Sequence, residues 1–186
     1  MDNSIPLNWK KIIDKETLNK SLTRICYEII EKNVNNQAIA IVGIRTNGEF
    51  LAKRILNKLT EISTETYDYG VLDITLYRDD LKYNNEMPLV KATDLPFSIK
   101  GKKIILIDDI LYTGRTIRSA LNAICDFGRP ACVELAVLAD RGHREFPIRP
   151  DYVGKNIPTN ETDFVKVKLE ETNHQEGIYL IPGESK

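Results

Sequence analysis

The chain has 186 residues, a length that fits one domain with at most a small subdomain. Hydrophobic residues make up 42% and charged residues 28%, which is ordinary for a soluble globular protein. The formal net charge of −1 gives no global sign of nucleic-acid or membrane binding, although a local basic face is compatible with it. We expect a cytoplasmic protein, because there is no signal-peptide pattern and no apolar run approaches ~18 residues.

The three cysteines, Cys26, Cys125 and Cys132, are odd in number and irregular in spacing. No CxxC pair is present, so the sequence does not predict a zinc site. Each cysteine has apolar neighbours. We therefore expect reduced cysteines in the core of a cytosolic protein.

Apolar periodicity predicts alternating helices and strands. The first helix follows Asp14, a candidate N-cap, and carries Glu16 in its first turn. The predicted helices are 15–32, 49–61 and 116–127. The predicted strands are 38–44, 67–77, 103–107, 132–139, a short one near Tyr152, 163–169 and 177–181.

Strands that alternate with helices predict an α/β fold, a mostly parallel sheet with helices on both faces. Sites in such sheets lie beyond the carboxyl ends of the strands. Two polar loops, 45–48 and 108–116, follow predicted strands, so they should open on the same side. The polar segment 78–94 is long enough to suggest a functional or mobile loop.

The second of these polar loops ends in Thr113-Gly114-Arg115-Thr116 and leads into a helix. Unpaired N–H groups and the helix dipole favour an anion at that position, and a glycine lets a ligand approach the backbone. A phosphate suits this turn. An ordinary strand-to-helix turn capped by threonine explains the four residues about equally well. The chain has no GxxxxGK[ST] and no GxGxxG after a strand.

Asp108 and Asp109 precede this turn and would repel one another unless a partner separates them. Sugar hydroxyls can donate to carboxylates, and Mg²⁺ can bridge them to a ligand. Two acids beside a phosphate-binding turn match a ribose 5-phosphate. Solvated acids at a strand end, or the acidic pocket of a receiver domain, are the alternatives.

The earlier loop, Gly43 to Gly48, encloses Arg45 and Thr46. A guanidinium with exposed backbone amides suits a second anion such as pyrophosphate. For this loop alone, a tight turn is the better explanation. Together, two anion sites and a diol site describe a ribose that carries a phosphate and a pyrophosphate.

The stretch IILIDDILYTGRT resembles the phosphoribosyl pyrophosphate (PRPP) motif of type I phosphoribosyltransferases. Further segments resemble the PyrR family, which pairs uracil phosphoribosyltransferase activity with RNA-binding control of pyrimidine operons. These segments are SLTRI (21–25), VGIRTNGEFLAKR (42–54), DITLYRDDL (73–81) and LADRGHREFPIRPDYVGKNIPT (138–159). The motif consists of Ile104, Ile105, Leu106, Ile107, Asp108, Asp109, Ile110, Leu111, Tyr112, Thr113, Gly114, Arg115 and Thr116.

The resemblance implies a single phosphoribosyltransferase domain, with a core at about 15–140 and a small hood at about 141–186 that includes N-terminal residues. It implies the reaction of uracil with PRPP to give UMP and pyrophosphate, with Mg²⁺ near Asp108 and Asp109. These two residues would hold the ribose hydroxyls, and Thr113, Gly114, Arg115 and Thr116 the 5-phosphate. Arg45 and Thr46 would hold pyrophosphate, and Arg78 and Asp79 would begin the mobile loop 78–94.

The base is expected near Tyr112 and the segment Leu138 to Gly142, which contains Ala139, Asp140 and Arg141. Related purine enzymes carry an acid at the position of Tyr112, so a tyrosine favours a smaller pyrimidine. An enzyme without RNA binding, or a phosphoribosyltransferase for a purine or for orotate, is the alternative.

The resemblance also implies a basic RNA-binding face on a homodimer or larger oligomer, and regulation by transcription attenuation that responds to UMP or UTP. Two departures from the family remove positive charge from that face: Tyr27 replaces a histidine and Asn47 replaces a basic residue. Solvated surface charges are the simpler explanation of the basic residues. The candidate RNA-binding residues are Thr23, Arg24, Arg144, Arg149 and Lys155.

Overall fold

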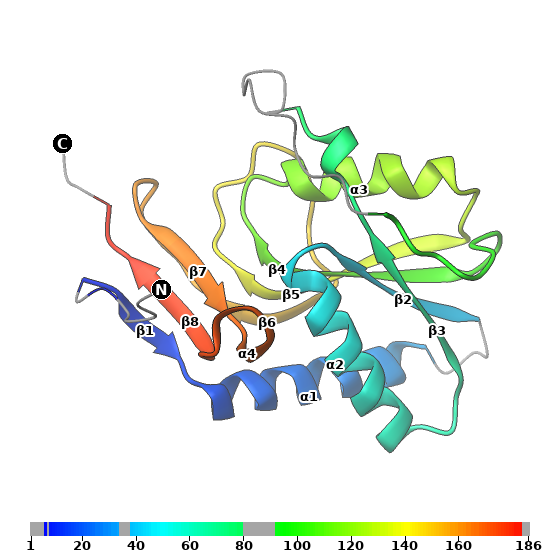
Figure 1. Ribbon diagram of the computed structural model, residues 1–186, viewed down its shortest axis with the longest axis horizontal. Helices are drawn as coiled ribbons and strands as arrows, with labels where there is room; N and C mark the ends of the chain where they lie inside the picture. The colour runs from blue at the N-terminus through cyan, green and yellow to red at the C-terminus, as the bar shows by residue number, and fades with distance from the viewer. Residues whose placement is uncertain (1–5, 7, 34–37, 80–91, 184–186) are drawn as a thin grey trace.

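The computed structural model describes residues 6, 8–33, 38–79 and 92–183. Its larger sheet has five strands in the order β3-β2-β4-β5-β6, and all neighbouring pairs are parallel. The strands are β3 (Tyr67–Leu72), β2 (Ile39–Ile44), β4 (Lys103–Leu111), β5 (Cys132–Asp140) and β6 (Tyr152–Asn156). Helices lie on both faces (Figure 1), which confirms the α/β class.

Three long helices cover the five-stranded sheet: α1 (Lys15–Lys32) and α2 (Asn47–Ile62) on one face and α3 (Arg115–Asp126) on the other (Figure 1). Asp14 caps α1 as predicted, because its carboxylate accepts a hydrogen bond from Thr17 N at 2.8 Å. The apolar residues that recur at helical spacing along each helix are buried against the sheet.

Alternation along β4 separates two apolar cores. Ile105 and Ile107 pack with α1 and α2, whereas Ile104 and Leu106 pack with α3. A central strand covered on both faces explains the uninterrupted apolar run that precedes Asp108. The polar residues begin only where the strand approaches its carboxyl end.

A second, smaller sheet has three antiparallel strands in the order β1-β8-β7 and is called the small sheet below. Its strands are β1 (Lys10–Ile13), β8 (Gly177–Ile181) and β7 (Phe164–Lys168), with the short helix α4 (Glu170–Asn173) between β7 and β8. The first and the last strand of the chain, β1 and β8, are neighbours in it (Figure 1).

Arg54 on α2 connects the small sheet to the larger unit. Its guanidinium donates to both carboxylate oxygens of Glu171, at 2.8 and 2.7 Å, and pairs with the buried Glu176. Lys15 and Glu170 form a second ion pair at 2.6 Å. These pairs fix α4 against α1 and α2.

Two strand boundaries differ from the prediction. The strand predicted at 67–77 ends at Leu72, because Asp73 accepts hydrogen bonds from Thr75 N (2.8 Å) and Thr75 Oγ1 (2.5 Å) and starts the 3₁₀ turn η1 (Thr75–Tyr77). The strand predicted at 103–107 continues to Leu111, because its ladder with β5 extends to the pair Leu111–Asp140.

The prediction of three core cysteines is wrong for two of them. Cys26 is buried, but Cys125 and Cys132 are exposed. Cys125 follows the buried Ile124 and therefore points about 100° away from it around α3. Cys132 is the first residue of β5, where the helices no longer cover the strand.

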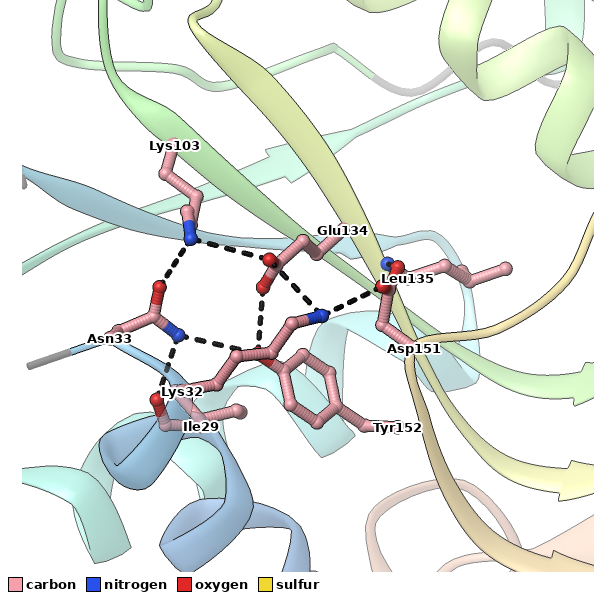
Figure 2. Close-up of polar contacts among 8 residues, drawn as sticks. All are labelled: Ile29, Lys32, Asn33, Lys103, Glu134, Leu135, Asp151 and Tyr152. Atoms are coloured by element: carbon pink, nitrogen blue, oxygen red, sulfur yellow. Dashed lines mark hydrogen bonds and ion pairs between the residues drawn. The ribbon is translucent and has the colours of Figure 1, made fainter.

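A partly buried polar network lies at the amino ends of the parallel strands, opposite to the ends from which the polar loops emerge (Figure 2). Glu134 accepts hydrogen bonds from Tyr152 Oη at 2.6 Å and Lys103 Nζ at 3.2 Å, and it pairs with Lys32 at 3.2 Å. Burial raises the pKa of Glu134, but the bonds from Tyr152, Lys103 and Lys32 outweigh it and lower the pKa overall.

None of the helices in the described part of the chain combines the length and the apolar character that a membrane crossing requires.

Candidate active site

A cavity of about 490 Å³ opens at the carboxyl ends of β2, β3 and β4. It brings together the loop after β2, the carboxylates of β4 and the first turn of α3, which confirms that the two predicted loops open on the same side. Residues of the small sheet and α4 close its far wall. The lining residues are Arg45, Thr46, Asn47, Asp73, Ile74, Thr75, Arg78, Asp108, Asp109, Ile110, Thr116, Lys166, Val167, Thr172 and Asn173.

Asp108 and Asp109 occupy the last part of β4 and differ in exposure. Asp108 is buried and Asp109 is half-buried. Burial raises the pKa of Asp108 well above its ordinary range, and the charge of Asp109 raises it further. Backbone amides partly offset the repulsion, since Asp109 N donates to Asp108 at 2.9 Å and Ile110 N donates to Asp109 at 2.8 Å.

The loop after β2 approaches these carboxylates closely. Asn47 Nδ2 donates to Asp109 Oδ2 at 2.7 Å. The approach requires glycine at position 48, because a Cβ there would lie 2.4 Å from the carbonyl oxygen of Ile107. Sequence reasoning included Asn47 in the loop Gly43 to Gly48 and in an RNA face, but gave it no role beside the acids. The structure places it in the lining of the cavity.

Arg45 lies at the edge of the same cavity, half-buried. Its guanidinium donates to Glu49 at 2.8 Å and to the carbonyl oxygen of Ala92 at 3.0 Å, while the buried Nε has no partner. The peptide bond between Arg45 and Thr46 is cis. Arg45 therefore keeps an N–H donor unused beside the carboxylate pair.

The turn before α3 is fixed from behind. Gly114 has a left-handed φ of 91° and N-caps α3. The carbonyl oxygen of Thr113 accepts hydrogen bonds from Glu145 N at 2.9 Å and Phe146 N at 3.0 Å. Thr116 lines the cavity, so the first turn of the helix faces the carboxylate pair.

The side chain of Arg115 is engaged in ion pairs and does not belong to the turn that is expected to bind phosphate. It pairs with Asp79 at 2.8 Å and with Glu145, and Arg118 pairs with the same Asp79 at 2.7 Å. Asp79 stands at the start of the predicted loop 78–94. These pairs tie that start to α3.

The far end of the 78–94 segment is also held near the cavity. Ala92 accepts from Arg45, and Asp94 forms a backbone bridge with Val71 of β3 through bonds of 2.8 and 2.7 Å. Residues 80–91, on which the prediction of mobility falls, lie outside the described residues.

The residues expected at the base form one cluster at the ends of β4 and β5. The guanidinium of Arg141 stacks on the ring of Tyr112 at 4.0 Å from its centroid, and Arg141 N donates to Leu111 O at 3.1 Å. Arg141 is buried and its Nε has no partner. Asp140 pairs with Arg144 at 2.5 Å, and Ala139 is buried beneath them.

Three of the candidate RNA-binding residues hydrogen bond within the protein, and the other two are exposed. Arg24 pairs with Glu28 and donates to the carbonyls of Val153 and Gly154, both at 2.7 Å. Arg144 donates to Ile148 O (3.0 Å), Tyr112 O (2.9 Å) and Gly142 O (3.1 Å). Thr23 is half-buried and bonds to Asn19 O at 2.9 Å. Arg149 and Lys155 are exposed.

Several cavity residues were not predicted. Asp73 follows β3, and the rule that sites lie beyond parallel strands could have pointed to it. Lys166, Thr172 and Asn173 come from β7 and α4 of the small sheet. The resemblance implied a hood at about 141–186, but no sequence signal indicated which of its residues would reach the cavity.

Comparison with known proteins covers almost the whole chain. Residues 8–172 match the model of the phosphoribosyl transferase domain family. A "Bifunctional protein PyrR" of Elusimicrobium minutum is 55% identical over 172 residues, 92% of this chain and 96% of that protein. The PyrR of Pelotomaculum thermopropionicum is 50% identical, over 92% of this chain and 94% of that protein.

The chain belongs to the PyrR family. This confirms the family to which the motif IILIDDILYTGRT and the four further segments pointed. The PyrR of Listeria welshimeri is similar to the chain at 50% identity, over 91% of this chain and 94% of that protein. At this level of identity the fold and the order of the site segments are shared along the chain.

Solved structures agree on the fold. A hypoxanthine-guanine phosphoribosyltransferase of Bacillus anthracis has a TM-score of 0.69 at 18% identity, over 93% of this chain and 98% of that one. A hypoxanthine phosphoribosyltransferase of Staphylococcus aureus has a TM-score of 0.68 at 19% identity, over 94% and 92%. The chain therefore has the type I phosphoribosyltransferase fold.

Proposed function

We propose that this PyrR-family chain transfers the 5-phosphoribosyl group of PRPP to uracil, giving UMP and pyrophosphate, and that it also binds RNA to regulate pyrimidine genes. The observation that carries the enzymatic half is the single cavity that joins Asp108 and Asp109 to Arg45, Thr46 and Thr116. A diol site and two anion sites at this spacing suit PRPP as a substrate.

In this proposal the two carboxylates hold the ribose. Asp108 and Asp109 accept hydrogen bonds from the 2- and 3-hydroxyls, and Asn47 keeps the Asp109 carboxylate oriented at 2.7 Å. Burial and the charge of Asp109 make the ionised form of Asp108 unfavourable. Hydroxyl donors or a cation bound between the two acids would reduce their repulsion and favour the ionised form.

The phosphates of PRPP take the two backbone sites. Thr113, Gly114, Arg115 and Thr116 receive the 5-phosphate through backbone N–H groups and hydroxyls at the positive end of α3. Arg45 and Thr46 receive the pyrophosphate, because both line the cavity and the guanidinium of Arg45 supplies positive charge there. Arg115 contributes its backbone, because its side chain pairs with Asp79 and Glu145.

Mg²⁺ fits this arrangement as a cation shared with the substrate. Within the described part of the chain, no cluster of three or more His, Cys, Asp or Glu side chains could hold a metal. Two carboxylates suit Mg²⁺ that takes its remaining oxygen ligands from phosphate groups and water. When bound, Mg²⁺ supplies positive charge to the departing pyrophosphate.

The transfer step needs orientation and charge stabilisation more than a nucleophile. The bond between C1 of the ribose and pyrophosphate breaks as N1 of uracil forms a bond to C1, and positive charge develops on the sugar. The N1 proton of uracil leaves to water or to the departing pyrophosphate. Asp108 and Asp109 fix the sugar, and Arg45 stabilises the leaving group. We assign to the segment 78–94, from Arg78 and Asp79 onward, the exclusion of water during this step.

The base is placed beside Tyr112, Ala139, Asp140 and Arg141. Tyr112 is the exposed member of this cluster, and the Arg141 guanidinium that stacks on its ring fixes the orientation of the ring toward the base. In this organisation the core spans about 15–140. The small sheet is the hood, formed by residues of about 141–186 with β1 as its N-terminal part.

The regulatory half rests on the PyrR relatives and on surface charge. Arg24 and Lys155 line one surface pocket, and Arg149 is exposed. In the proposal Thr23, Arg24 and Arg144 shape the RNA-binding face while Arg149 and Lys155 supply its free charge. UMP or UTP in the PRPP site would change RNA affinity, and a homodimer or larger cytoplasmic oligomer would present the face.

Substitution of the carboxylate pair tests the enzymatic half. Asp108→Asn with Asp109→Asn should lower pyrophosphate release from PRPP and uracil by at least about 10²–10³-fold, because each residue holds reacting sugar in the transition state. Asp126→Asn, at the far end of α3, is the matched control and should keep wild-type turnover. Wild-type turnover in the double variant would contradict the assignment.

A further inference from the structure

One face of the small sheet gathers lysines around two aromatic rings. The residues Trp9, Lys11, Lys166, Lys168 and Tyr179 are called the small-sheet patch. Lys11 of β1 and Lys166 of β7 both pair in register with Tyr179 of β8, so the three side chains share a face. Val167, Ile178 and Ile13 face the other way and are buried in the core.

The cations of the patch lie over the rings. Lys166 and Lys168 place their ammonium groups 5.7 and 5.2 Å from the centroid of Trp9. Lys11 and Lys168 lie 5.3 and 6.0 Å from the centroid of Tyr179. Trp9 is half-buried and its ring centroid is 6.0 Å from that of Tyr179. The patch therefore combines the partly exposed ring of Trp9 with three cations, two of which lie over that ring.

The patch is short of negative charge. Within the described residues, neither Lys11 nor Lys166 forms an ion pair, and Lys168 bonds only to the amide of Gln175, at 3.0 Å. Asp14 is close enough to feel the charge of Lys11, but its carboxylate caps α1. Elsewhere the small sheet pairs its charges well, as in Arg54 with Glu171 and Lys15 with Glu170.

Beneath these groups, Tyr179 is 1% exposed and its hydroxyl has no partner. Because the Tyr179 ring is enclosed, it supports the lysines from behind, and Trp9 is the ring of the patch that a ligand can reach. The ligand class must offer negative charge to the lysines and a flat surface to the ring of Trp9.

We propose that the small-sheet patch binds single-stranded RNA, with a base stacked on Trp9 and phosphates at Lys11, Lys166 and Lys168. Lysines along a surface with interleaved aromatic rings are the usual means of holding a single strand without reading its sequence. This inference rests on the RNA-binding half of the proposed function. It assigns RNA a second contact surface, apart from Arg149 and Lys155.

The position of the patch would couple RNA to the nucleotide site. Lys166 also lines the cavity that contains Asp108 and Asp109, and its neighbour Val167 forms part of the same wall. A strand bound to the patch would lie at the rim of that cavity. RNA bound at the small-sheet patch and a nucleotide bound in the cavity would both affect the position of the small sheet. Each ligand would thereby change the affinity for the other.

Trp9 is the only tryptophan of the chain, so its fluorescence reports on the patch alone. Titration with a 20-nucleotide oligouridylate should quench this fluorescence in a saturable way, because a base stacks on the indole. Inorganic polyphosphate carries charge without bases and should not quench it. Equal quenching by free UMP would overturn the proposal, since a mononucleotide site needs no strand.

Charge removal provides the matched test. Lys11→Gln with Lys168→Gln should lower the slope of log affinity against log salt by roughly 1.4, about 0.7 for each lost contact to a single strand. Lys53→Gln with Lys100→Gln removes the same charge from elsewhere on the surface and should leave the slope unchanged. Lys11→Arg with Lys168→Arg should retain binding, which excludes a folding defect as the cause.

Removal of the stacking surface provides the second test, read by anisotropy of labelled RNA. Trp9→Leu should weaken oligouridylate binding roughly 5- to 140-fold, the range expected for one stacked base. Uracil phosphoribosyltransferase turnover of Trp9→Leu should stay at the wild-type level. An unchanged RNA affinity would overturn the proposal.

A comparison with Arg149→Ala plus Lys155→Ala separates this inference from the proposed function. If these substitutions abolish RNA binding and the small-sheet variants do not, the regulatory face stands and the small-sheet patch is rejected. If only the small-sheet variants lose binding, the patch stands and the face at Arg149 and Lys155 is wrong.

Discussion

Asp108 combines an unfavourable position with the role we propose for it. It is a buried carboxyl beside a second acid, and both burial and the neighbouring charge raise its pKa. An amide at position 108 would have nearly the same shape as the acid and would avoid the repulsion. The free protein therefore carries a destabilising charge where the substrate is expected to supply hydroxyl donors.

Asp108→Asn should accordingly make the free protein more stable at neutral pH while it reduces activity. A carboxyl with a raised folded-state pKa stabilises the fold when protonated, and this contribution is lost as the pH rises through the raised value. The Tm of the variant should exceed that of the wild type by a margin that grows above pH 4, on the order of 2–4 °C for about 1 kcal/mol.

Thermal unfolding from pH 4 to 8 measures this difference, with Asp94→Asn as an exposed control. A variant that is less stable than the wild type at pH 8 would show that the pair is held by contacts other than those described.

At the scale of single residues, the sequence was informative where the residues lie close together along the chain. The roles toward PRPP stay predictions, but the acids and the turn 113–116 could be grouped into one site because they follow one another at and beyond the end of β4. Asn47 could not, because its bond to Asp109 depends on a close approach of the first turn of α2 to β4. Cys125 and Cys132 were misplaced because apolar neighbours do not specify which side of an element a residue occupies.

At the scale of the elements, the two edges of the parallel sheet differ in chemistry. At the carboxyl ends of the strands, the acids and Arg45 line an open cavity. At the amino ends, Glu134 forms a network with Lys103, Lys32 and Tyr152 (Figure 2). The two edges are the ends of the same strands. The network therefore fixes β4 and β5, which carry the site at their other ends.

Glu134→Gln should destabilise the protein by about 2 kcal/mol at pH 7, because it weakens the hydrogen bonds to charged groups and leaves the half-buried Lys103 without its counter-charge. The lowered pKa of Glu134 contributes stability above its unfolded value of 4.5, which is lost as the pH falls through the folded value. The variant should therefore lose less stability than the wild type between about pH 5 and pH 3.

Urea unfolding across this pH range provides the measurement. Glu16→Gln changes an exposed i,i+4 pair by the same chemistry and should cost below about 1 kcal/mol at any pH. Parallel acid profiles for the wild type and Glu134→Gln would contradict the account of the network.

Element boundaries were predictable from periodicity for α1, α2, α3 and most strands. The exceptions have tertiary or side-chain causes. β4 runs on to Leu111 because β5 continues to pair with it, and β3 stops at Leu72 because the Asp73 carboxylate captures the backbone of Thr75. Neither cause is visible in hydrophobic pattern alone.

At the scale of the whole molecule, the small sheet closes the site, and Arg54 holds it in place. This single guanidinium binds Glu171 in a bidentate manner and pairs with Glu176, which is buried. The short helix α4 contains Glu171 and also contributes Thr172 and Asn173 to the cavity wall. The resemblance implied a hood at about 141–186, but the contacts through which Arg54 holds the small sheet could not be predicted from the sequence.

Arg54→Met should cost about 3 kcal/mol of stability, since it leaves the buried Glu176 carboxylate without a counter-charge. Arg54→Met combined with Glu176→Gln should be less destabilised than Arg54→Met alone, because the uncompensated charge is gone. Equilibrium denaturation of the two variants checks this order. The KM for PRPP of the single variant should rise, because α4 loses its anchor. An unchanged KM would show that α4 keeps its position by other contacts.

The central claim is that the cavity serves PRPP and uracil. The most direct measurement is pyrophosphate release by the purified protein with PRPP and Mg²⁺, compared among uracil, guanine, hypoxanthine and orotate. The account predicts release with uracil and none above background with the other three bases. Release with a purine or with orotate, and none with uracil, would contradict it.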